Sequence, residues 1–359
     1  AVTDTSRIVV VTGHQADSVE AVLQPYGVGF ARQTEQKGTG HALACCRDAV
    51  KEKSGRLMVL YGDTPLLSAN TLRTLLESHT AHAQAATLMT TEVANPHGYG
   101  RVVLNERGHV AAIVEHKDCT PAQLEIRLIN SGIYCFDAQP MWQHLSEIVP
   151  NAKSGEYYLT DMAEIFGRHG LAIHNHRIED PRELLGINTR IELAEADAIL
   201  RERKNRELML SGVTLEKPET VTIDLDVEVG CDTVIEPFVK LLGHTKIGED
   251  CRIGTGSILE NAHLESNTEV GPYTLVADSK LESGAQAGPF SRLRMHAVAR
   301  ANSRIGNFVE LKNTELGAGS KSQHLAYLGD TSIGAGSNIG AGTITCNYDG
   351  AKKHRTTIG

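Results

Sequence analysis

Aliphatic residues recur every six positions in the second half of the sequence. The unbroken series is Val229, Ile235, Leu241, Ile247, Ile253 and Leu259. The repeat returns at Leu264, Val270, Val276, Ile305, Leu316, Ile333 and Ile339. An α-helix repeats every 3.6 residues and a strand every two, so neither accounts for this period. The repeat predicts a left-handed parallel β-helix, whose triangular turns have three flat sides of about six residues, each with one side chain pointing inward.

Glycine often follows the repeated aliphatic residue. It does so at Gly230, Gly248, Gly254, Gly271, Gly306, Gly317, Gly334 and Gly340. We expect this small residue to turn the corner of the coil, where a Cβ would crowd the bend. Coils of this kind are tied to acyl transfer, which gives a first hypothesis for the chemistry.

Length and glycine content predict two domains. A chain of 359 residues is too long for one core, and residues 229–359 hold 18 of the 34 glycines. We expect an α/β domain over residues 1–188, a linker helix over 189–212 and the coil over 213–359. The linker helix is predicted from the helix-favouring residues 190–210, which Gly212 ends.

Charge and cysteine content exclude several classes of protein. The net charge of −9 argues against a nucleic-acid partner. Seven scattered cysteines without a CxxC pair favour free thiols in the cytoplasm over disulfides or a zinc site. No run of about 20 apolar residues is present, so no membrane span is predicted.

The first domain alternates strand and helix patterns. Residues 8–11 and 57–60 are continuous apolar runs of the kind buried on both faces of a sheet. This pattern predicts a Rossmann-like fold with a mostly parallel sheet, which binds ligands at the carboxyl ends of its strands. Asp63 follows such a strand and could hold a divalent cation or cap the turn before Pro65.

Several other residues in this domain have two interpretations each. Gly38 and Gly40 bracket Thr39 before a helical stretch, which suits an anion or a base edge but also a plain turn. Four further residues stand in turns or at the ends of apolar runs and could bind a sugar or serve as satisfied structural residues: Gly100, Glu115, Asn130 and Asn188.

These motifs together resemble one family. They are Gln33, residues 37–42, 61–63, 98–101, 114–118, 129–132, 155–161 and 186–188, followed by the hexapeptide coil. In this order they closely resemble the bacterial bifunctional N-acetylglucosamine-1-phosphate uridyltransferase/glucosamine-1-phosphate acetyltransferases, over essentially the whole chain. The resemblance implies an α/β nucleotidyltransferase domain followed by a left-handed β-helix acetyltransferase domain.

The resemblance implies roles for residues of the first domain. Asp63 and Asn188 match the pair that holds the catalytic Mg²⁺, and Gln33 and Thr39 match positions that contact the uracil of UTP. The other substrate-binding positions of the uridyltransferase are Gly38, Tyr61, Gly62, Gly100, Glu115 and Asn130. In the family, the phosphate of N-acetylglucosamine 1-phosphate attacks the α-phosphorus of UTP, and pyrophosphate leaves.

The sequence departs from the family pattern at both ends. The glycine-rich phosphate loop and the basic residues that open this domain in the family do not precede Ala1, and the last hexad is cut at Ile358 and Gly359. We therefore expect a fragment whose first domain does not transfer uridylyl groups as given.

The candidate for acetyl-transfer chemistry lies where the repeat is disturbed, between the hexads 316–321 and 333–338. The amine of glucosamine 1-phosphate must lose a proton as it attacks acetyl-CoA, and a histidine suits that task. The resemblance selects His324 as this catalytic base. Glu310 is a hypothetical orienter of His324 from a neighbouring turn.

The resemblance assigns the remaining acetyltransferase residues. Glucosamine 1-phosphate is bound by Arg294, Lys312, Tyr327, Asn338 and Lys353. Acetyl-CoA is bound by Ala341, Asn347 and Tyr348. Family members form homotrimers, and burial of the flat coil faces gives this assembly a physical reason.

Two alternatives remain open at this point. One is a single-function sugar-1-phosphate nucleotidyltransferase whose coil only assembles subunits, and the other is a non-catalytic scaffold. Lys312 and the segment 323–327 argue against the first, and the joint presence of Asp63, Asn188 and His324 argues against the second.

Overall fold

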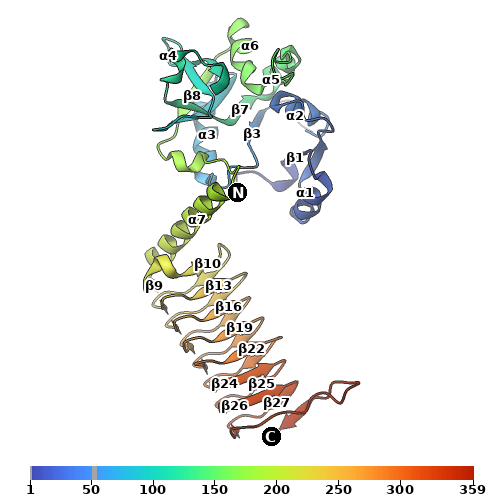
Figure 1. The fold of residues 1–359 in the computed structure, drawn as a ribbon, viewed down its shortest axis with the longest axis vertical. Coiled ribbons are helices and arrows are strands. Elements are labelled where there is room, and N and C mark those ends of the chain that lie inside the picture. The colour runs from blue at the N-terminus through green and yellow to red at the C-terminus, as the bar shows by residue number, and fades with distance from the viewer. Residues whose placement is uncertain (1, 51–54) are drawn as a thin grey trace. The chain divides into compact units, whose positions relative to one another are not determined.

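The computed structural model describes residues 2–50 and 55–359, which form two compact units (Figure 1). Unit 1 is Ala1–Leu193 and unit 2 is Ala194–Gly359. The boundary falls within helix α7 (Arg190–Leu210), which lies inside the range 189–212 where the sequence predicts a linker helix. None of the helices in the described part of the chain combines the length and the apolar content needed to cross a membrane.

Unit 1 contains a six-stranded sheet and a separate parallel pair. Its strands are β1 (Val9–Thr12), β2 (Gly29–Arg32), β3 (Arg56–Val59), β4 (Ala86–Glu92), β5 (Arg101–Leu104), β6 (Val110–Val114), β7 (Leu128–Asp137) and β8 (Ile173–Arg177). The pairs β1–β2 and β4–β8 are parallel, whereas the long strand β7 pairs antiparallel with β3, β4 and β5. The α/β class is confirmed, but the sheet is mixed and not mostly parallel, because the central strand β7 runs against its neighbours.

The helices of unit 1 are α1 (Ala16–Leu23), α2 (Thr39–Cys45), α3 (Ala69–His82), α4 (Pro121–Leu124), α5 (Ala138–His144) and α6 (Met162–Arg168). Of these, α5 and α6 pack on the six-stranded sheet through the main core, and α3 packs on it through a smaller cluster around Leu75. Short 3-10 turns are η1 (Thr5–Arg7), η2 (Gln24–Tyr26), η3 (His116–Asp118), η4 (Leu145–Glu147), η5 (Leu159–Asp161) and η6 (Pro181–Leu184). Phe136 of β7, Met141 of α5 and Phe166 of α6 are fully buried together in that core.

Unit 2 is the left-handed parallel β-helix that the repeat predicts, with its short strands stacked turn upon turn (Figure 1). One face has β9 (Thr214–Leu215), β12 (Val234–Ile235), β15 (Arg252–Ile253), β18 (Glu269–Val270), β21 (Gln286–Ala287) and β28 (Asn338–Ile339). A second has β10 (Thr222–Ile223), β13 (Lys240–Leu242), β16 (Ile258–Glu260), β19 (Leu275–Ala277) and β22 (Arg292–Arg294). The third has β11 (Glu228–Val229), β14 (Lys246–Ile247), β17 (His263–Leu264), β20 (Lys280–Leu281), β23 (Val298–Ala299), β25 (Glu315–Leu316), β27 (Thr331–Ile333) and β29 (Thr356–Ile358). The longer strands β24 (Arg304–Lys312) and β26 (Lys321–Gly329) run along the first face and continue into the second.

The repeated aliphatic residues form the core of the coil. From Ile235 to Ile333 they are buried, and Val229 and Ile339 pack against the same core at partial exposure. The apparent gaps in the repeat are filled inside the coil by Leu281, Ala287, Leu293, Ala299, Leu311, Ser322 and Leu328, all buried. The inward repeat therefore continues beneath the segment of His324, and the irregularity there concerns only outward-facing residues.

All but one of the glycines after the repeated residues are required by the neighbouring turn of the coil, the exception being Gly340, where a Cβ would meet no atom within 4 Å. A Cβ on Gly254 would lie 2.6 Å from the backbone nitrogen of Pro272, and one on Gly230 would lie 2.6 Å from the carbonyl carbon of Gly248. Neither glycine has a positive φ. Glycine is therefore needed at these corners because the backbone of the next turn leaves no room for a Cβ. A left-handed backbone conformation is not the reason, since neither residue adopts one.

Buried hydroxyl side chains join successive turns near the same corners. Thr233 Oγ1 donates to the carbonyl oxygen of Gly248 at 2.9 Å, and Ser257 Oγ donates to that of Gly271 at 3.0 Å. Ser320 Oγ donates to the carbonyl oxygen of Gly334 at 2.7 Å. A buried hydrogen bond of this kind contributes about 1 kcal/mol, and its loss leaves a buried polar group unsatisfied.

Substituting Gly254→Ala should destabilise unit 2, because the new Cβ would press on the backbone of the next turn. We expect a loss of about 1–3 kcal/mol, the usual cost of overpacking, measured as a lower midpoint of thermal unfolding. Gly167→Ala in α6 is the matched control, since a Cβ there meets no atom within 4 Å. Equal midpoints for Gly254→Ala and the unaltered protein would contradict this account of the corner.

Candidate active sites

Asp63 and Asn188 lie close together in unit 1. The backbone N–H of Ile187 donates to the carbonyl oxygen of Asp63 at 2.9 Å, which ties the two loops to each other. A Cβ on Gly186 would lie 3.5 Å from Asp63 Oδ2 and 3.9 Å from Asn188 Nδ2, so the carboxylate and the amide flank the same glycine. Both side chains are exposed and offer oxygen ligands, which Mg²⁺ prefers.

A second group consists of Gly100, Glu115 and Asn130. The backbone N–H of Asn130 donates to the carbonyl oxygen of Gly100 at 2.9 Å. A Cβ on Gly100 would lie 3.6 Å from Asn130 Cβ and 3.8 Å from Glu115 Oε1. Burial raises the pKa of Glu115, and the charge of Lys117 opposes this rise. The three predicted sugar-contacting residues are therefore neighbours around one backbone position.

Tyr61 connects these two groups. Its ring lies against Gly132, where a Cβ would overlap it. Burial raises the pKa of the Tyr61 hydroxyl, a hydrogen bond with Thr39 opposes the rise, and the charges of Glu115 and Asp63 add to it. Tyr61 thus lies within electrostatic reach of both carboxylates, so the two groups belong to one site.

The segment from Gln33 to Thr39 is held in place by hydrogen bonds within unit 1. Gln33 Nε2 donates to the carbonyl oxygen of Gly38 at 3.0 Å, and the backbone N–H of Leu159 donates to Thr39 Oγ1 at 3.0 Å. Gly38 has a φ of 93°, and a Cβ there would lie 2.6 Å from the carbonyl oxygen of Tyr157. These contacts fix the predicted uracil-binding segment at the start of α2.

Three further residues at this site, Gly62, Gly186 and Leu159, offer no reactive side chain. A Cβ on Gly62 would meet no atom within 4 Å, so packing within the chain does not require glycine there. Gly186 and Leu159 contribute to the site but received no role from the sequence. They belonged to recognisable motifs, yet a glycine and a backbone N–H offer no side-chain chemistry from which a role could be inferred.

The basic residues predicted to bind phosphate lie side by side on the coil. Arg294 of β22 and Lys312 of β24 are partners in the parallel ladder. Arg294 Nε donates to Glu310 Oε1 at 2.6 Å, and Lys312 Nζ donates to Asp330 Oδ2 at 3.4 Å. Each cation is therefore paired with a carboxylate in this structure while both face the same part of the coil.

Asp330 is the centre of a buried polar cluster that the sequence did not identify. Only 7% of the residue is exposed, and its carboxylate accepts hydrogen bonds from Asn313 Nδ2 at 2.6 Å and from Asn347 Nδ2. The bond with Asn313, followed by those with Asn347 and Lys312, lowers the pKa of Asp330. Asp330 thereby positions Asn347 and Lys312, two of the predicted site residues.

His324 is exposed on β26, opposite Asn307 of β24. The carboxylate of Glu310, its hypothetical orienter, is bound by Arg294. Across residues 2–50 and 55–359 no hydrogen bond joins Glu310 to His324. The ladder explains why, because Glu310 lies opposite Tyr327 and not opposite His324.

The other predicted acetyltransferase residues lie on the later turns. Tyr327 is half-buried beside Gly329, whereas Asn338, Ala341 and Lys353 are exposed. Tyr348 is also exposed, pairs with Lys353 in an antiparallel bridge and donates from its hydroxyl to the carbonyl oxygen of Gly350 at 2.7 Å. The coil site therefore has a buried half around Asp330 and an open half that includes His324.

Replacing Asp330 with Asn should remove a pH-dependent contribution to stability. The folded-state pKa of Asp330 lies below its ordinary value of 3.8, so its bonds stabilise the fold above that pH and are lost as the pH falls through the folded-state value. We expect Asp330→Asn to cost about 1–3 kcal/mol at pH 7 and the difference from the unaltered protein to shrink below pH 4. Urea unfolding between pH 3 and 7 measures the free energy of unfolding of both proteins, and substitution of the exposed Asp226 (Asp226→Asn) is the control. If the difference in unfolding free energy between Asp330→Asn and the unaltered protein does not vary with pH, the stabilising role of the Asp330 carboxylate is refuted.

Both units match known protein families. Residues 2–176 match the nucleotidyl transferase family, and residues 226–261 match the bacterial transferase hexapeptide family (six repeats). These two regions coincide with the α/β unit and with the first turns of the coil.

Several curated relatives are similar over almost the whole chain. The bifunctional protein GlmU of Solibacter usitatus is 56% identical over 98% of this chain and 76% of its own length. GlmU of Koribacter versatilis is 47% identical over 99% of this chain and 76% of its own length. GlmU of a Nostoc species is 47% identical over 99% of this chain and 77% of its own length. The chain therefore belongs to the GlmU family of bifunctional transferases.

Proposed function

We propose that this protein makes UDP-N-acetylglucosamine in two transfers, with acetyl transfer on the coil and uridylyl transfer in the α/β unit. The observation that carries the proposal is that each unit assembles its own set of the predicted ligands. Asp63 and Asn188 meet in unit 1, and Asn347 and Lys312 meet around Asp330 in unit 2.

In the acetyl transfer, the amine of glucosamine 1-phosphate attacks the carbonyl carbon of acetyl-CoA and the thioester C–S bond breaks. His324 accepts the proton that the amine loses. Arg294 and Lys312 bind the sugar phosphate, and Lys312 is already positioned by Asp330. Tyr327, Asn338 and Lys353 bind the sugar, and Ala341, Asn347 and Tyr348 bind acetyl-CoA. Asn347 presents a fixed amide to the reacting centre because its side chain is buried and bonded to Asp330.

In the uridylyl transfer, a phosphate oxygen of N-acetylglucosamine 1-phosphate attacks the α-phosphorus of UTP and pyrophosphate leaves. Gly100, Glu115 and Asn130 hold the sugar, and Gln33 and Thr39 contact the uracil. The oxygen ligands of Asp63 and Asn188 fit Mg²⁺, which supplies charge neutralisation on the crowded phosphates when it is bound. The contribution of the chain itself is in-line positioning of the two substrates.

The proposed assembly is a homotrimer formed through the coil. Large apolar side chains are exposed along one corner on successive turns at Tyr273, Phe290, Phe308 and Leu325, and Phe238 is exposed two turns before Tyr273. Tyr273 stacks on Phe290 at 5.4 Å, and Phe290 stacks on Phe308 at 5.7 Å. A continuous exposed apolar stripe of this kind favours burial against another copy of the chain. Leu325 directly follows His324, so a second copy on this stripe would also cover the open half of the acetyl site.

The proposed location is the cytoplasm. All seven cysteines are free thiols, as is usual for proteins of a reducing compartment.

In the complete protein, substituting His324→Ala should reduce acetyl transfer by about 100-fold or more, since the base that accepts the amine proton is lost. Uridylyl transfer should be unchanged. The measurement is CoA release with glucosamine 1-phosphate beside pyrophosphate release with UTP, and His263→Ala, an exposed histidine on β17, is the control. Normal CoA release by His324→Ala would overturn the assignment of the base.

In the complete protein, substituting Asp63→Asn should have the reverse effect. Loss of one anionic ligand should lower uridylyl transfer by about 100-fold or more and raise the Mg²⁺ concentration needed for half-maximal rate, while acetyl transfer is spared. Asp48→Asn, an exposed carboxylate of the same unit, is the control. A parallel loss of both activities would count against separate sites.

A further inference from the structure

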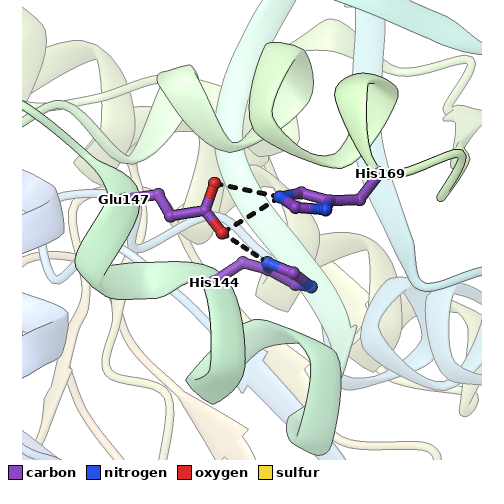
Figure 2. A group of neighbouring side chains, drawn as sticks. All are labelled: His144, Glu147 and His169. Atoms are coloured by element: carbon purple, nitrogen blue, oxygen red, sulfur yellow. Dashed lines mark hydrogen bonds and ion pairs between the residues drawn. The ribbon is translucent and has the colours of Figure 1, made fainter.

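Unit 1 contains a cluster of two histidines and a glutamate outside the site described above (Figure 2). His144 ends α5, Glu147 ends η4, and His169 directly follows α6. His144 Nδ1 lies 2.6 Å from Glu147 Oε1, and His169 Nε2 lies 3.0 Å from both carboxylate oxygens. Figure 2 shows all three side chains directed toward one another from separate elements.

We propose that His144, Glu147 and His169 form a binding site for a late first-row transition metal ion, with Zn²⁺ as the natural occupant. The ligands are His144 Nδ1, His169 Nε2 and a carboxylate oxygen of Glu147. Imidazole nitrogen is a preferred ligand of zinc, cobalt, nickel and copper, whereas Mg²⁺ and Ca²⁺ prefer oxygen. Two imidazoles and one carboxylate with an open position form a known type of zinc site.

The geometry needs only a small adjustment to admit the ion. All three ligand atoms lie within 4.8 Å of one another. Tetrahedral ligands at about 2.0–2.1 Å from zinc are separated from each other by roughly 3.3 Å. The two His–Glu separations of 2.6 and 3.0 Å therefore have to widen by about 0.7 and 0.3 Å, respectively, which a half-exposed Glu147 side chain permits.

Burial differs among the three ligands in a way that suits metal binding. The His144 side chain is only 9% exposed, and its ring packs edge-on against Phe166 at 6.2 Å. Glu147 and His169 are 37% and 40% exposed, which leaves water access to the remaining coordination position. One ligand is thus fixed by packing, and the other two stand where an ion can enter.

The three side chains converge closely enough for one ion to bind all of them. The centroids of the two imidazole rings lie 4.0 Å apart, and each ring has a nitrogen within 3.0 Å of the Glu147 carboxylate. A divalent ion would accept a lone pair from each imidazole and from the carboxylate, and it would replace the two His–Glu hydrogen bonds.

The ion would brace one wall of a cavity next to α2. Leu145 and Ser146, which lie between two of the ligands in the sequence, line this cavity of about 160 Å³ together with Gly40 and Tyr157. Coordination would join η4 to the end of α6 and so fix that wall. The site is distinct from the Asp63–Asn188 pair in its ligands and in the metal that it prefers, and it does not depend on the proposed function.

The test is Co²⁺ titration of the tag-free, metal-stripped protein, followed by Zn²⁺ competition. We expect one Co²⁺ per chain with visible ligand-field absorption, displacement by Zn²⁺, no displacement by millimolar Mg²⁺, and a higher midpoint of thermal unfolding with Zn²⁺. His169→Gln and Glu147→Gln should each weaken Co²⁺ binding by at least about tenfold and abolish the rise in midpoint.

Control variants separate this site from others. His82→Gln removes an exposed histidine of α3, and Asp63→Asn alters the predicted Mg²⁺ pair; both should bind Co²⁺ like the unaltered protein. Circular dichroism and thermal unfolding without metal verify that the variants fold, and the half-exposed positions 147 and 169 make this attainable. The proposal is overturned if the unaltered protein binds no Co²⁺, if His169→Gln binds it equally well, or if His82→Gln removes the binding.

Discussion

Parallel hydrogen bonding between successive turns of the coil determines which side chains of unit 2 can meet. Val234 pairs with Arg252, and Arg252 pairs with Glu269, so neighbours in space are one turn apart in the sequence. The turns can approach this closely because each inward position is apolar or small and because glycine occupies the crowded corners. The polar cluster around Asp330 uses the same ladder, since Asn313 and Asn347 lie one turn before and one turn after it.

Unit 1 assembles its site by another means. Its ligands come from loops that are far apart in the sequence and are joined by backbone hydrogen bonds, as between Ile187 and Asp63 and between Asn130 and Gly100. Glycine permits the close approach, because a side chain at Gly132 would displace the Tyr61 ring that connects the two halves of the site. In unit 1 such a glycine makes room for one particular neighbouring group, as Gly132 does for the Tyr61 ring. In the coil, glycines on successive turns make room for the backbone of the next turn.

This difference explains what the sequence could predict. The repeat predicts the coil and its core because the same physical demand is imposed on every side of every turn. The inward positions absent from the predicted series are Ala287, Ala299 and Ser322, which are small or polar, and Leu281, Leu293, Leu311 and Leu328. The antiparallel pairing of β7 is non-local and leaves no periodic signal. Asp330 lies in none of the motifs used for the prediction. Its spacing of 17 residues from both Asn313 and Asn347 is one turn of the coil, and this spacing could have predicted that the three side chains meet. The roles of individual site residues came from the family resemblance, and the residues alone left them open.

The two halves of the acetyl site make different demands on assembly. Asp330 holds Asn347 and Lys312 in fixed positions within one chain, so this half is organised without a partner. His324 lies exposed beside Leu325, at the end of the apolar stripe that begins at Tyr273. The proposed base on this open strand is surrounded by water, and a second copy seated on the stripe would exclude that water and restrict the imidazole. The proposed trimer would therefore bear on proton transfer at the coil, whereas the predicted ligands of unit 1 are gathered within a single chain.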